Sequence, residues 1–435
     1  EVGKDGTITI NGLGWGGVGP NNDNISASGV VAWYQNVLTV ANCSITGLVQ
    51  PAFLGNGSAF SGIYLGTAVN ASYDVYNNTF SVNYTAQGGF AGIYSAAGKS
   101  GTGNTVNIYN NSISNNNTPN VGNTNIDCIA LYSGATTLNI YNNIIDNNSF
   151  GAGIDSLTGG STMNYIYWEN APTTKGTVNI YGNTIINNTR RLGPNMNGGN
   201  TNILRNGSNG GNTTVNVYDN VIDNIHIGTN FATFGLTAIS TATTHNVYNN
   251  RITNLHHSGG YIYAMSEANA TTAYWHGNKC QYISHHVTNA NPIYGFTSTS
   301  GGPALYVYNN FIGDFYSPLH TGTIYGMYFE TWTKLGLYNN TIYLDNAPTG
   351  TGNATIVGIY GLHDIGSLDM RNNLVINNST PKGSGKVIAF QRGWNTPSLA
   401  SYALTSNNND FYAKALQQAQ AMPIQAGKSF HFISG

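Results

Sequence analysis

Charged side chains are scarce in this sequence. They make up 7% of its 435 residues, and 15 Lys and Arg nearly balance 17 Asp and Glu, so the formal net charge is −2. The usual charged share is about 25%. A chain this neutral lacks the basic surface that attracts nucleic acid or an anionic membrane. We therefore expect neither as a partner, and we expect amide and hydroxyl groups to supply solubility.

Cysteine is also scarce, and long apolar runs are absent. Cys43, Cys128 and Cys280 lie too far apart in sequence for a disulfide framework or a zinc pattern, so we expect three small buried apolar side chains. No run is long enough to span a bilayer. Disorder is excluded, because disordered chains lack aromatic residues and this one has 29 Tyr and 15 Phe. The chain begins at Glu1 rather than Met, from which we expect a processed or trimmed protein.

What the chain does have is an asparagine-rich phrase that recurs throughout. It reads TVNIYNNSISNN near residue 105, TLNIYNNIIDNN near 137 and TVNIYGNTIINN near 177. Aligned on the second Asn of the phrase, the copies follow one another at intervals of 28 to 40 residues, and degenerate copies are centred on Cys43 and Asn409. The other anchor residues are Asn78, Asn111, Asn143, Asn183, Asn220, Asn250, Asn278, Asn310, Asn340 and Asn373. Regular spacing of this kind indicates a repeat architecture of twelve units.

The pattern inside each phrase predicts a strand, a bend and a second strand. Val106 and Ile108 alternate with Asn107 and Tyr109, and period two is typical of a strand. The next two residues are asparagines, which favour turns. The second of them, Asn111, is expected to point inward. Stacked anchor asparagines can then form an amide ladder, in which each buried side chain bonds to its equivalents above and below.

A second recurring phrase predicts a third strand. It consists of an apolar residue, any residue, Gly or Ala, and another apolar residue, as in FSGI at Phe60 and IYGF at Ile293. Ankyrin and tetratricopeptide arrays have a similar period but need helix-forming residues. The fold expected is therefore all-β, a single-chain parallel β-helix or β-solenoid of about twelve coils, with coils about 4.8 Å apart. We expect an N-terminal cap at 1–30, repeats at 31–412 and a C-terminal cap at 413–435.

The C-terminal cap is expected to contain a short helix over Ala413–Met422, because this stretch is rich in helix formers and a proline follows it. The stretch KSFHFIS after the helix alternates like a strand. Two interpretations of this strand are open. It is either the last edge strand of its own domain or a strand that pairs with a neighbouring molecule.

The repeated VNIYNNTI and GIY elements resemble the right-handed parallel β-helix (pectin-lyase-like) repeats of secreted and cell-surface proteins of Bacteroidota and similar bacteria. The resemblance covers roughly residues 30–412 and implies the fold more strongly than a function, because this fold carries enzymes, adhesins and structural proteins. Enzymes of the polygalacturonase type would carry DD, GHG and RIK motifs, and none of these occurs. Lyases would need a carboxylate cluster for Ca²⁺, and the nearest approach is Asp146 and Asp223, two coils apart. We predict no catalytic residue and no cofactor.

One unit departs from the pattern after Asn183. The second phrase is missing there, and the stretch RRLGPNMNGGNTNILRNGSNGG intervenes with Arg190, Arg191 and Arg205. We interpret it as a long surface loop, with contact to an acidic partner as the alternative.

Histidines recur a few residues after the anchor in three successive units, at His226, His256, His257, His285 and His286. Stacked imidazoles can bind a transition metal or respond to pH, but neither cysteine nor carboxylate completes a ligand set, so no metal site is predicted. Simple stacking of rings is the alternative.

A tyrosine column two residues before the anchor is the main surface feature. Strand alternation directs it outward, and His276 and Arg371 replace tyrosine in two units. The column comprises Tyr76, Tyr109, Tyr141, Tyr181, Tyr218, Tyr248, Tyr308 and Tyr338. Exposed stacked aromatics can contact a sugar or a protein, or stabilise the coils themselves.

These observations favour a non-enzymatic extracellular or cell-surface β-solenoid. Such a protein would be structural or adhesive, and would associate with itself or with other proteins of a surface fibre or layer. The alternative is a carbohydrate-binding or polysaccharide-processing β-helix that uses the tyrosine face.

Overall fold

In a computed structural model the chain divides into two compact units, Glu1–Ala232 and Thr233–Gly435, and each is described by itself. The structure describes residues 9–10, 14–15, 27–32, 37–51, 59–66, 72–84, 88–96, 104–119, 125–151, 162–170, 175–191, 199–209, 211–228, 231–362, 364–393, 401–414 and 430–433. In this part of the chain there is no α-helix, and so none that could cross a membrane.

A coil of either unit contains three successive strand positions. In one coil the first strand is β10 (Thr105–Tyr109), a bend follows at Asn110, and the second strand is β11 (Ser112–Ser114). Asn110 has a φ of 55°, the left-handed conformation that asparagine tolerates. The third strand, β13 (Ile126–Ser133), completes the coil. The predicted strand, bend and strand are therefore confirmed.

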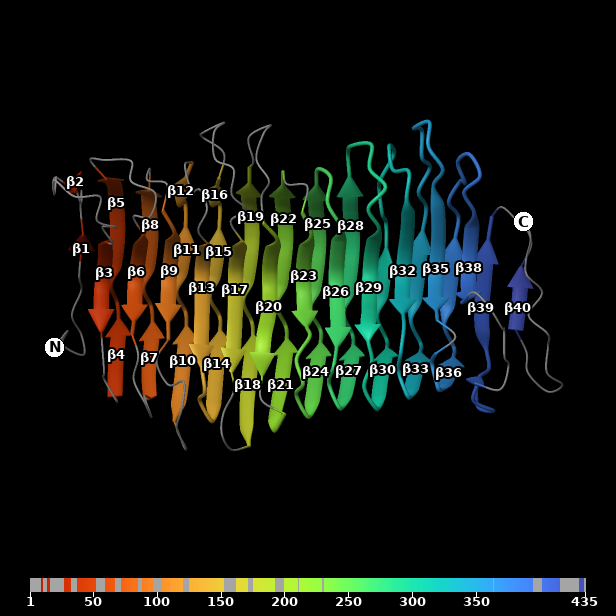
Figure 1. Ribbon diagram of the computed structural model, residues 1–435, viewed down its shortest axis with the longest axis horizontal. Coiled ribbons are helices and arrows are strands. Elements are labelled where there is room, and N and C mark those ends of the chain that lie inside the picture. Colours follow the sequence, from red (N-terminus) through yellow and green to blue (C-terminus); the bar gives the residue numbers. More distant parts are fainter. Residues whose placement is uncertain are drawn as a thin grey trace. The chain divides into compact units, whose positions relative to one another are not determined.

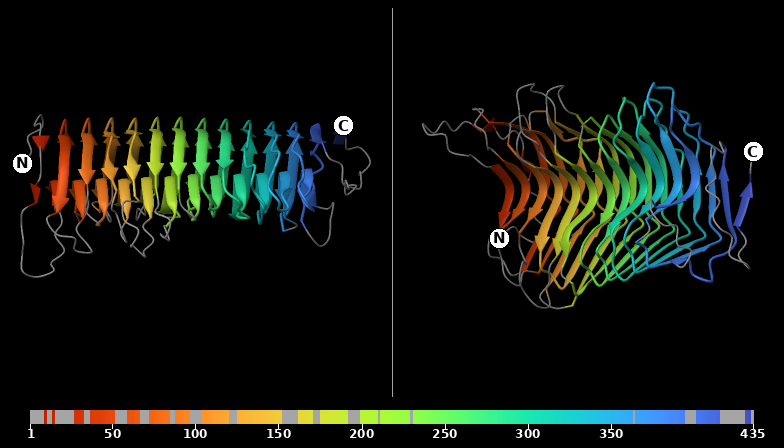
Figure 2. Two further views of the ribbon diagram at one scale, coloured as in Figure 1. Left: turned by 90° about the horizontal axis from the view of Figure 1, so that it is seen from above. Right: turned by 45° about the vertical axis from the view of Figure 1, so that its right-hand side comes forward.

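The first unit stacks each strand type in parallel (Figures 1 and 2). First strands are β4 (Val37–Ala41), β7 (Ser72–Tyr76), β10, β14 (Thr137–Tyr141), β18 (Gly176–Tyr181) and β21 (Thr213–Tyr218). Second strands are β5 (Ser44–Pro51), β8 (Thr79–Tyr84), β11, β12 (Asn117–Thr118), β15 (Ile144–Asp146), β16 (Ser149–Phe150), β19 (Thr184–Arg190) and β22 (Val221–Ile227). Third strands are β3 (Ala27–Ala32), β6 (Phe60–Leu65), β9 (Phe90–Ser95), β13, β17 (Met163–Asn170) and β20 (Thr201–Asn209). Before them, β1 (Thr9–Ile10) and β2 (Gly14–Trp15) both pair with β5.

The second unit repeats the same arrangement. First strands are β24 (Thr244–Tyr248), β27 (Thr272–His276), β30 (Ala304–Tyr308), β33 (Lys334–Tyr338) and β36 (Ser367–Arg371). Second strands are β25 (Arg251–His257), β28 (Lys279–His285), β31 (Phe311–Gly313), β34 (Thr341–Leu344), β37 (Leu374–Asn377), β39 (Asn409–Ala413) and β40 (Phe430–Ile433). Third strands are β23 (Thr233–Ala238), β26 (Ile262–Ala268), β29 (Ile293–Ser300), β32 (Thr323–Phe329), β35 (Thr355–Gly361) and β38 (Val387–Arg392).

Strands of one type pair in register, so that equivalent residues of successive coils lie side by side. Between β10 and β14, for example, Ile108 pairs with Ile140 and Tyr109 with Tyr141. Val106, Ile108 and their equivalents are fully buried and form the core. The described residues form an all-β parallel β-solenoid with about ten coils, which confirms the predicted fold class but gives fewer coils than the twelve that we expected. The three cysteines are free and buried, as expected.

Part of the stretch between Asn183 and Asn220 forms strands instead of the surface loop that we predicted. Residues Thr201–Asn209 form β20, which pairs in parallel with β17. Arg190 is the last residue of β19 and is buried. Its guanidinium donates hydrogen bonds to the carbonyl of Asn200 and to the hydroxyl of Thr201, and these bonds offset the cost of burial. The third strand is present in this coil although its sequence lacks the small residue of the second phrase.

At the C-terminus, the expected helix over Ala413–Met422 begins within a strand. Ala413 is the last residue of β39, and residues 415–429 lie outside the described part of the chain. The strand expected in KSFHFIS is present as β40, and it pairs in parallel with β39 of the same chain.

Candidate contact surface

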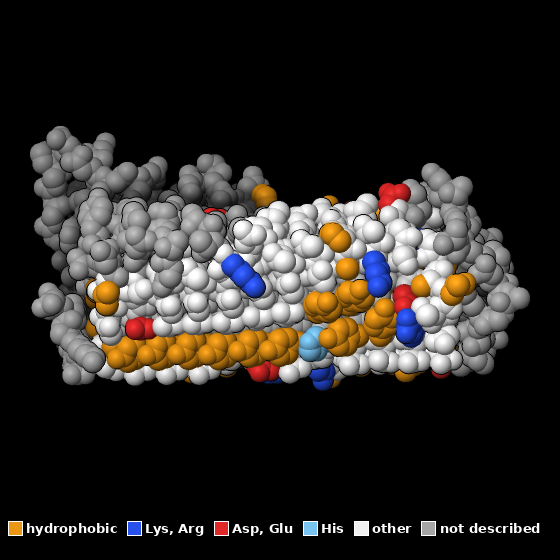
Figure 3. Space-filling view, turned by 90° about the horizontal axis from the view of Figure 1, so that it is seen from below, with side chains coloured by type: hydrophobic (Ala, Val, Ile, Leu, Met, Phe, Trp, Pro, Cys, Tyr) orange, Lys and Arg blue, Asp and Glu red, His pale blue; other side chains and the backbone are white. Residues whose placement is uncertain are grey.

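The tyrosines of the first unit form one continuous row on the outer side of the first strands. The rings of Tyr76, Tyr109, Tyr141, Tyr181 and Tyr218 stack in sequence, with centroids 4.8–4.9 Å apart and planes within 9° of parallel. All five side chains are half-buried. The row is visible as a band of apolar side chains in Figure 3. Regular strand pairing thus places these rings at the repeat distance of the coils.

Stacking determines which part of each tyrosine a partner can reach. A ring inside the row, such as that of Tyr141, has a second ring against both of its faces. Sugars are typically held against an open aromatic face, whereas this row presents ring edges and hydroxyl groups. The first unit therefore offers a row of polar-tipped edges rather than a set of open platforms.

A second outer row, which the sequence interpretation did not include, runs beside the tyrosines. It lies two residues earlier on the same strands and consists of Asp74, Asn107, Asn139, Asn179 and Asn216. Each asparagine side chain donates to the preceding member at 2.7–2.8 Å, and the first acceptor is the Asp74 carboxylate. The signal was available in the sequence, because Asn107, Asn139, Asn179 and Asn216 share one repeat position. We call the two rows together the contact face.

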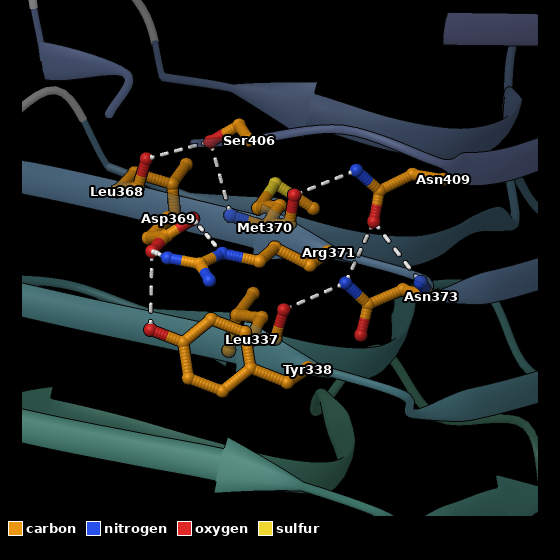
Figure 4. Close-up of polar contacts among 9 residues, drawn as sticks. All are labelled: Leu337, Tyr338, Leu368, Asp369, Met370, Arg371, Asn373, Ser406 and Asn409. Atoms are coloured by element: carbon orange, nitrogen blue, oxygen red, sulfur yellow. Dashed lines mark hydrogen bonds and ion pairs between the residues drawn. The ribbon is translucent and has the colours of Figure 1, made fainter. Parts of the chain in front are cut away.

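The tyrosine row of the second unit is less regular. Tyr248, His276 and Tyr308 stack with centroids 4.7–5.0 Å apart. Tyr338 instead donates to the Asp369 carboxylate at 3.2 Å, and a Cβ at Gly336 would lie 2.5 Å from its hydroxyl. The Tyr338 ring thus lies over Gly336. Figure 4 shows its hydroxyl group bonded to Asp369.

Charged side chains accompany this change in the second unit. Arg371 forms an ion pair with Asp369 and lies over the Tyr338 ring, 5.3 Å from its centroid. The Arg371 contact lowers the pKa of the Asp369 carboxyl, although burial acts in the opposite direction as the largest single influence. The Lys334 ammonium lies 5.4 Å from the Tyr306 centroid. Here the outer surface is mixed in charge, whereas the contact face of the first unit carries one carboxylate.

A further aromatic row lies on the third strands of each unit. In the first unit Tyr64 stacks on Tyr94 at 5.3 Å. In the second unit Phe234, Tyr263, Tyr294 and Tyr325 stack at 4.9–5.2 Å. These tyrosines belong to the GIY and IYG segments of the second phrase, so the sequence contained this signal as well.

The anchor asparagines form the expected ladder in both units. Asn111 is 1% exposed, and its side-chain nitrogen donates both to the carbonyl of Val75 and to the amide oxygen of Asn143. That oxygen also accepts the backbone N–H of Asn111. The first unit repeats this pattern from Asn78 to Asn220 and the second from Asn250 to Asn409, whose contact with Asn373 is drawn in Figure 4. The anchor asparagines are thus structural and not available to a ligand.

A second buried ladder was not predicted. Asn116, Asn148 and Asn188 lie five residues after three of the anchors, and their side chains bond to one another at 2.8 Å. The amide oxygen of Asn116 also accepts the backbone N–H of Val82. Each ladder closes a bend between strand segments, because a residue with a positive φ, most often asparagine, precedes every member.

The histidines that we considered as metal ligands separate into different environments. His226, in the first unit, is exposed and bonds to Asn224 at 2.9 Å. In the second unit His257 and His285 are buried in contact, whereas His256 and His286 form an outer pair. Among the described residues no group of three or more His, Cys, Asp or Glu side chains is arranged to hold a metal ion.

One buried arrangement in the second unit has the hydrogen-bond order of a hydrolase triad. The Ser240 hydroxyl lies 3.0 Å from Nε2 of His245, and Nδ1 of His245 lies 2.8 Å from Glu267. Trp275 donates to the same carboxylate at 2.6 Å. His245 and Glu267 are 0% exposed and Ser240 is 4% exposed, so no substrate reaches the hydroxyl. The arrangement satisfies buried polar groups.

The remaining carboxylate candidates lie apart. Asp146 and Asp223 occupy one column with Ile186 between them, as the repeat predicted. Asp146 accepts a hydrogen bond from Asn187. Two carboxylates two coils apart do not supply the six to eight oxygens that Ca²⁺ takes.

Comparison with known proteins finds no matching family model, no matching curated protein and no matching solved structure.

Proposed function

We propose that this protein is a non-enzymatic structural module that associates side by side with copies of itself through the contact face of the first unit. The observation that carries the proposal is the composition of that face. Two regular rows, one of tyrosine edges and one of side-chain amides, repeat with the spacing of the coils. Only Asp74 brings a charge to the two rows.

The spacing favours a partner that is itself a β-solenoid. Members of each row are one coil apart, so a partner meets every member at once only if its own groups repeat at the same distance of about 4.8 Å. A second copy of the chain has that repeat. A face without appreciable charge also brings no repulsion between copies and no attraction for nucleic acid.

The two rows are complementary to each other. Tyr109 and Asn107 lie on one strand two residues apart, so the rows are separated by roughly 6.6 Å. A two-fold axis parallel to the rows and midway between them places the tyrosines of one copy opposite the amides of the other. Each tyrosine hydroxyl can then donate to an amide oxygen, which retains a free lone pair.

The location that we propose is the cell surface or the extracellular medium, as part of a fibre or layer. This proposal rests on the resemblance to the pectin-lyase-like β-helix repeats of Bacteroidota-type surface proteins. The buried Ser240–His245–Glu267 arrangement supports the non-enzymatic part of the proposal and does not bear on location.

Sedimentation velocity over a concentration series, together with electron microscopy, tests the association. Wild-type protein is expected to form laterally paired particles. Asn139→Lys places a positive charge in the middle of the amide row and should shift the protein to monomers. The control Asn142→Lys puts the same charge on the exposed bend one residue beyond the tyrosine row. Monomeric wild-type protein at all concentrations, or equal effects of both variants, would contradict the proposal.

A second candidate function is carbohydrate binding on the second unit. The observation in its favour is the interrupted row, because Tyr338 lies over Gly336 and the described residues show no ring stacked on Tyr308 from that side. A ring face without a stacked neighbour is a surface on which a sugar can stack, and Lys334 and Arg371 lie over the rings of Tyr306 and Tyr338 in the same unit. A panel of polysaccharides tests it. Retention that is lost in Tyr308→Ala would favour binding, and release of reducing or unsaturated ends would contradict the non-enzymatic proposal.

A further inference from the structure

Histidine is distributed unevenly between the two units. Of the ten histidines, only His226 precedes residue 233. In the second unit three buried imidazoles follow one another from coil to coil. The centroids of His257 and His285 are 5.7 Å apart, and those of His285 and His320 are also 5.7 Å apart. We call these three residues the histidine cluster. His257 ends β25, His285 ends β28, and His320 lies in the segment after β31.

The inner rings of this cluster have unmet hydrogen-bonding capacity. Both ring nitrogens of His285 and both of His320 are buried without a hydrogen bond of ordinary geometry, and so is the hydroxyl oxygen of Ser317. His257 differs, because its Nδ1 accepts the backbone N–H groups of Gly259 and Gly260, each at 2.9 Å. Unpaired nitrogens are unusual, because buried polar groups are nearly always hydrogen-bonded. A ring that took up a proton here would have few partners to stabilise its charge.

The groups that face the cluster do not offset a positive charge. His256, His286 and Tyr316 lie on the outer side. The His286 centroid is 5.9 Å from that of His256 and 5.9 Å from that of Tyr316. Burial lowers the pKa of His285 to about 4, and the neighbouring His320 and His286 act in the same direction. Burial also lowers the pKa of His320 to about 4. The carbonyls of Gly260 and Thr323 act in the opposite direction, and neither ring forms an ion pair in the described part of the chain.

We propose that the histidine cluster is an acid-operated release for the second unit, in which protonation of His285 and His320 separates the coils that contain β25 and β28 while the first unit stays folded. The sign follows from the two states of the rings. The ordinary value of 6.5 in the unfolded chain exceeds the folded value of about 4. As the pH falls from about 6.5 to about 4, the unfolded state therefore binds protons first, and the second unit loses stability.

One other titrating group in the second unit acts the opposite way. Burial raises the pKa of the Glu267 carboxyl, against the influence of its His245 partner, so proton uptake there favours the folded state as the pH falls. A test must separate this contribution from that of the cluster. Replacing only cluster residues does so, because the His245–Glu267 pair is then the same in both proteins.

Amide hydrogen exchange read by mass spectrometry, corrected for the intrinsic effect of pH on exchange, resolves the two units. At about pH 4.5, peptides that cover β25 and β28 should lose protection while those that cover β10 and β14 keep it. The double variant H285F/H320F should slow exchange of β28 at this pH by about tenfold or more relative to wild type, because each pKa unit corresponds to a tenfold change. The control His226→Phe, on the exposed histidine of the first unit, should match wild type.

Two results would overturn the proposal. One is loss of protection in both units at the same pH, and the other is an unchanged acid response in H285F/H320F. If the double variant does not fold at neutral pH, the single variants H285Q and H320Q take its place. Each should then move the loss of protection to lower pH, and failure of both to do so counts against the proposal.

Discussion

The two units share one type of coil but differ in the polar side chains that they bury. In the first unit, asparagines bond to asparagines, and the buried carboxylate of Asp127 accepts a hydrogen bond from Asn164 at 2.6 Å. The second unit keeps the anchor ladder but adds the histidine cluster and the His245–Glu267 pair. Amides carry no charge at any pH, whereas imidazoles and carboxylates do. The comparison shows that one repeat can keep the same uncharged ladder and combine it with different titrating groups in its interior.

The largest effect is expected when the shared ladder is broken. Asn143→Ala removes four hydrogen bonds of the ladder. Two come from the backbone N–H and the side chain of Asn111, and two go from the Asn143 side chain to the carbonyl of Ile108 and the amide oxygen of Asn183. At about 1 kcal/mol for each lost partner, the free energy of unfolding should fall by roughly 4 kcal/mol. Urea denaturation measures the change. Asn310→Ala should give a similar loss in the second unit, since the ladder is common to both.

A matched control lies one residue earlier. Asn142 has a φ of 54° and is exposed at the bend, and the equivalent residue of the next coil is Gly182. Asn142→Gly should therefore change stability by less than about 0.5 kcal/mol. A large loss in this variant would show that the bend rather than the ladder accounts for the effect of Asn143→Ala.

The next effect separates the units by pH. Burial raises the pKa of Asp127 to about 6, above the ordinary value of 3.8. The folded state therefore takes up a proton first, and the first unit gains stability as the pH falls from about 6 to about 4, opposite in sign to His285 and His320. Asp127→Asn removes this cost and should stabilise the protein at pH 8 by up to about 3 kcal/mol, with little effect at pH 4. Thermal unfolding at both pH values measures it, and equal stabilisation at both would contradict the explanation.

A smaller effect is expected in the tyrosine row. Tyr141→Ala removes two stacked contacts and should cost about 1–3 kcal/mol, since an aromatic pair contributes about 0.5–1.5 kcal/mol. Tyr141→Phe retains both ring contacts and should be nearly neutral in stability. A loss of association in Tyr141→Phe would instead identify the hydroxyl as the group that contacts a neighbouring copy.

The smallest effect is expected from His276→Tyr, a substitution that makes the tyrosine row of the second unit more like that of the first. His276 stacks between Tyr248 and Tyr308, and burial lowers its pKa. His276→Tyr should extend the tyrosine row and stabilise the protein by a few tenths of a kcal/mol at neutral pH. The gain should grow in mild acid, because protonation of the His276 imidazole lowers the stability of the wild-type protein there. A pH-independent gain would show that packing alone explains it.

The features that sequence predicted are those in which a residue contacts its own equivalent. Asn111 bonds to Asn143 and Tyr109 stacks on Tyr141, so a shared repeat position was sufficient to place them. Two of the features that it missed, the outer amide row and the second buried ladder, also join equivalent residues. Two others join residues of different positions. His320 contacts His285 from the segment after β31, whereas His285 ends β28. Ser240 bonds to His245, and His245 bonds to Glu267 on another strand.

The buried position of Arg190 illustrates a second reason for failure. Its side chain bonds to Asn200 and to Thr201, the first residue of β20, a strand whose sequence lacks the small residue found in most third strands. The strand forms because in-register pairing with β17 supplies its backbone hydrogen bonds. Pairing with a neighbouring strand can therefore produce a strand in a coil whose own sequence only weakly predicts one.

The outer amide row has an electrical consequence. Every side-chain amide from Asn216 to Asn107 donates toward the N-terminus, so their dipoles align and the positive end of the row lies at the Asp74 carboxylate. An anion at the positive end of aligned dipoles is the arrangement found at helix N-termini, here constructed from side chains. Hydrogen bonds in such a chain polarise one another. The one charge of the row is thereby placed where the aligned amide dipoles favour it.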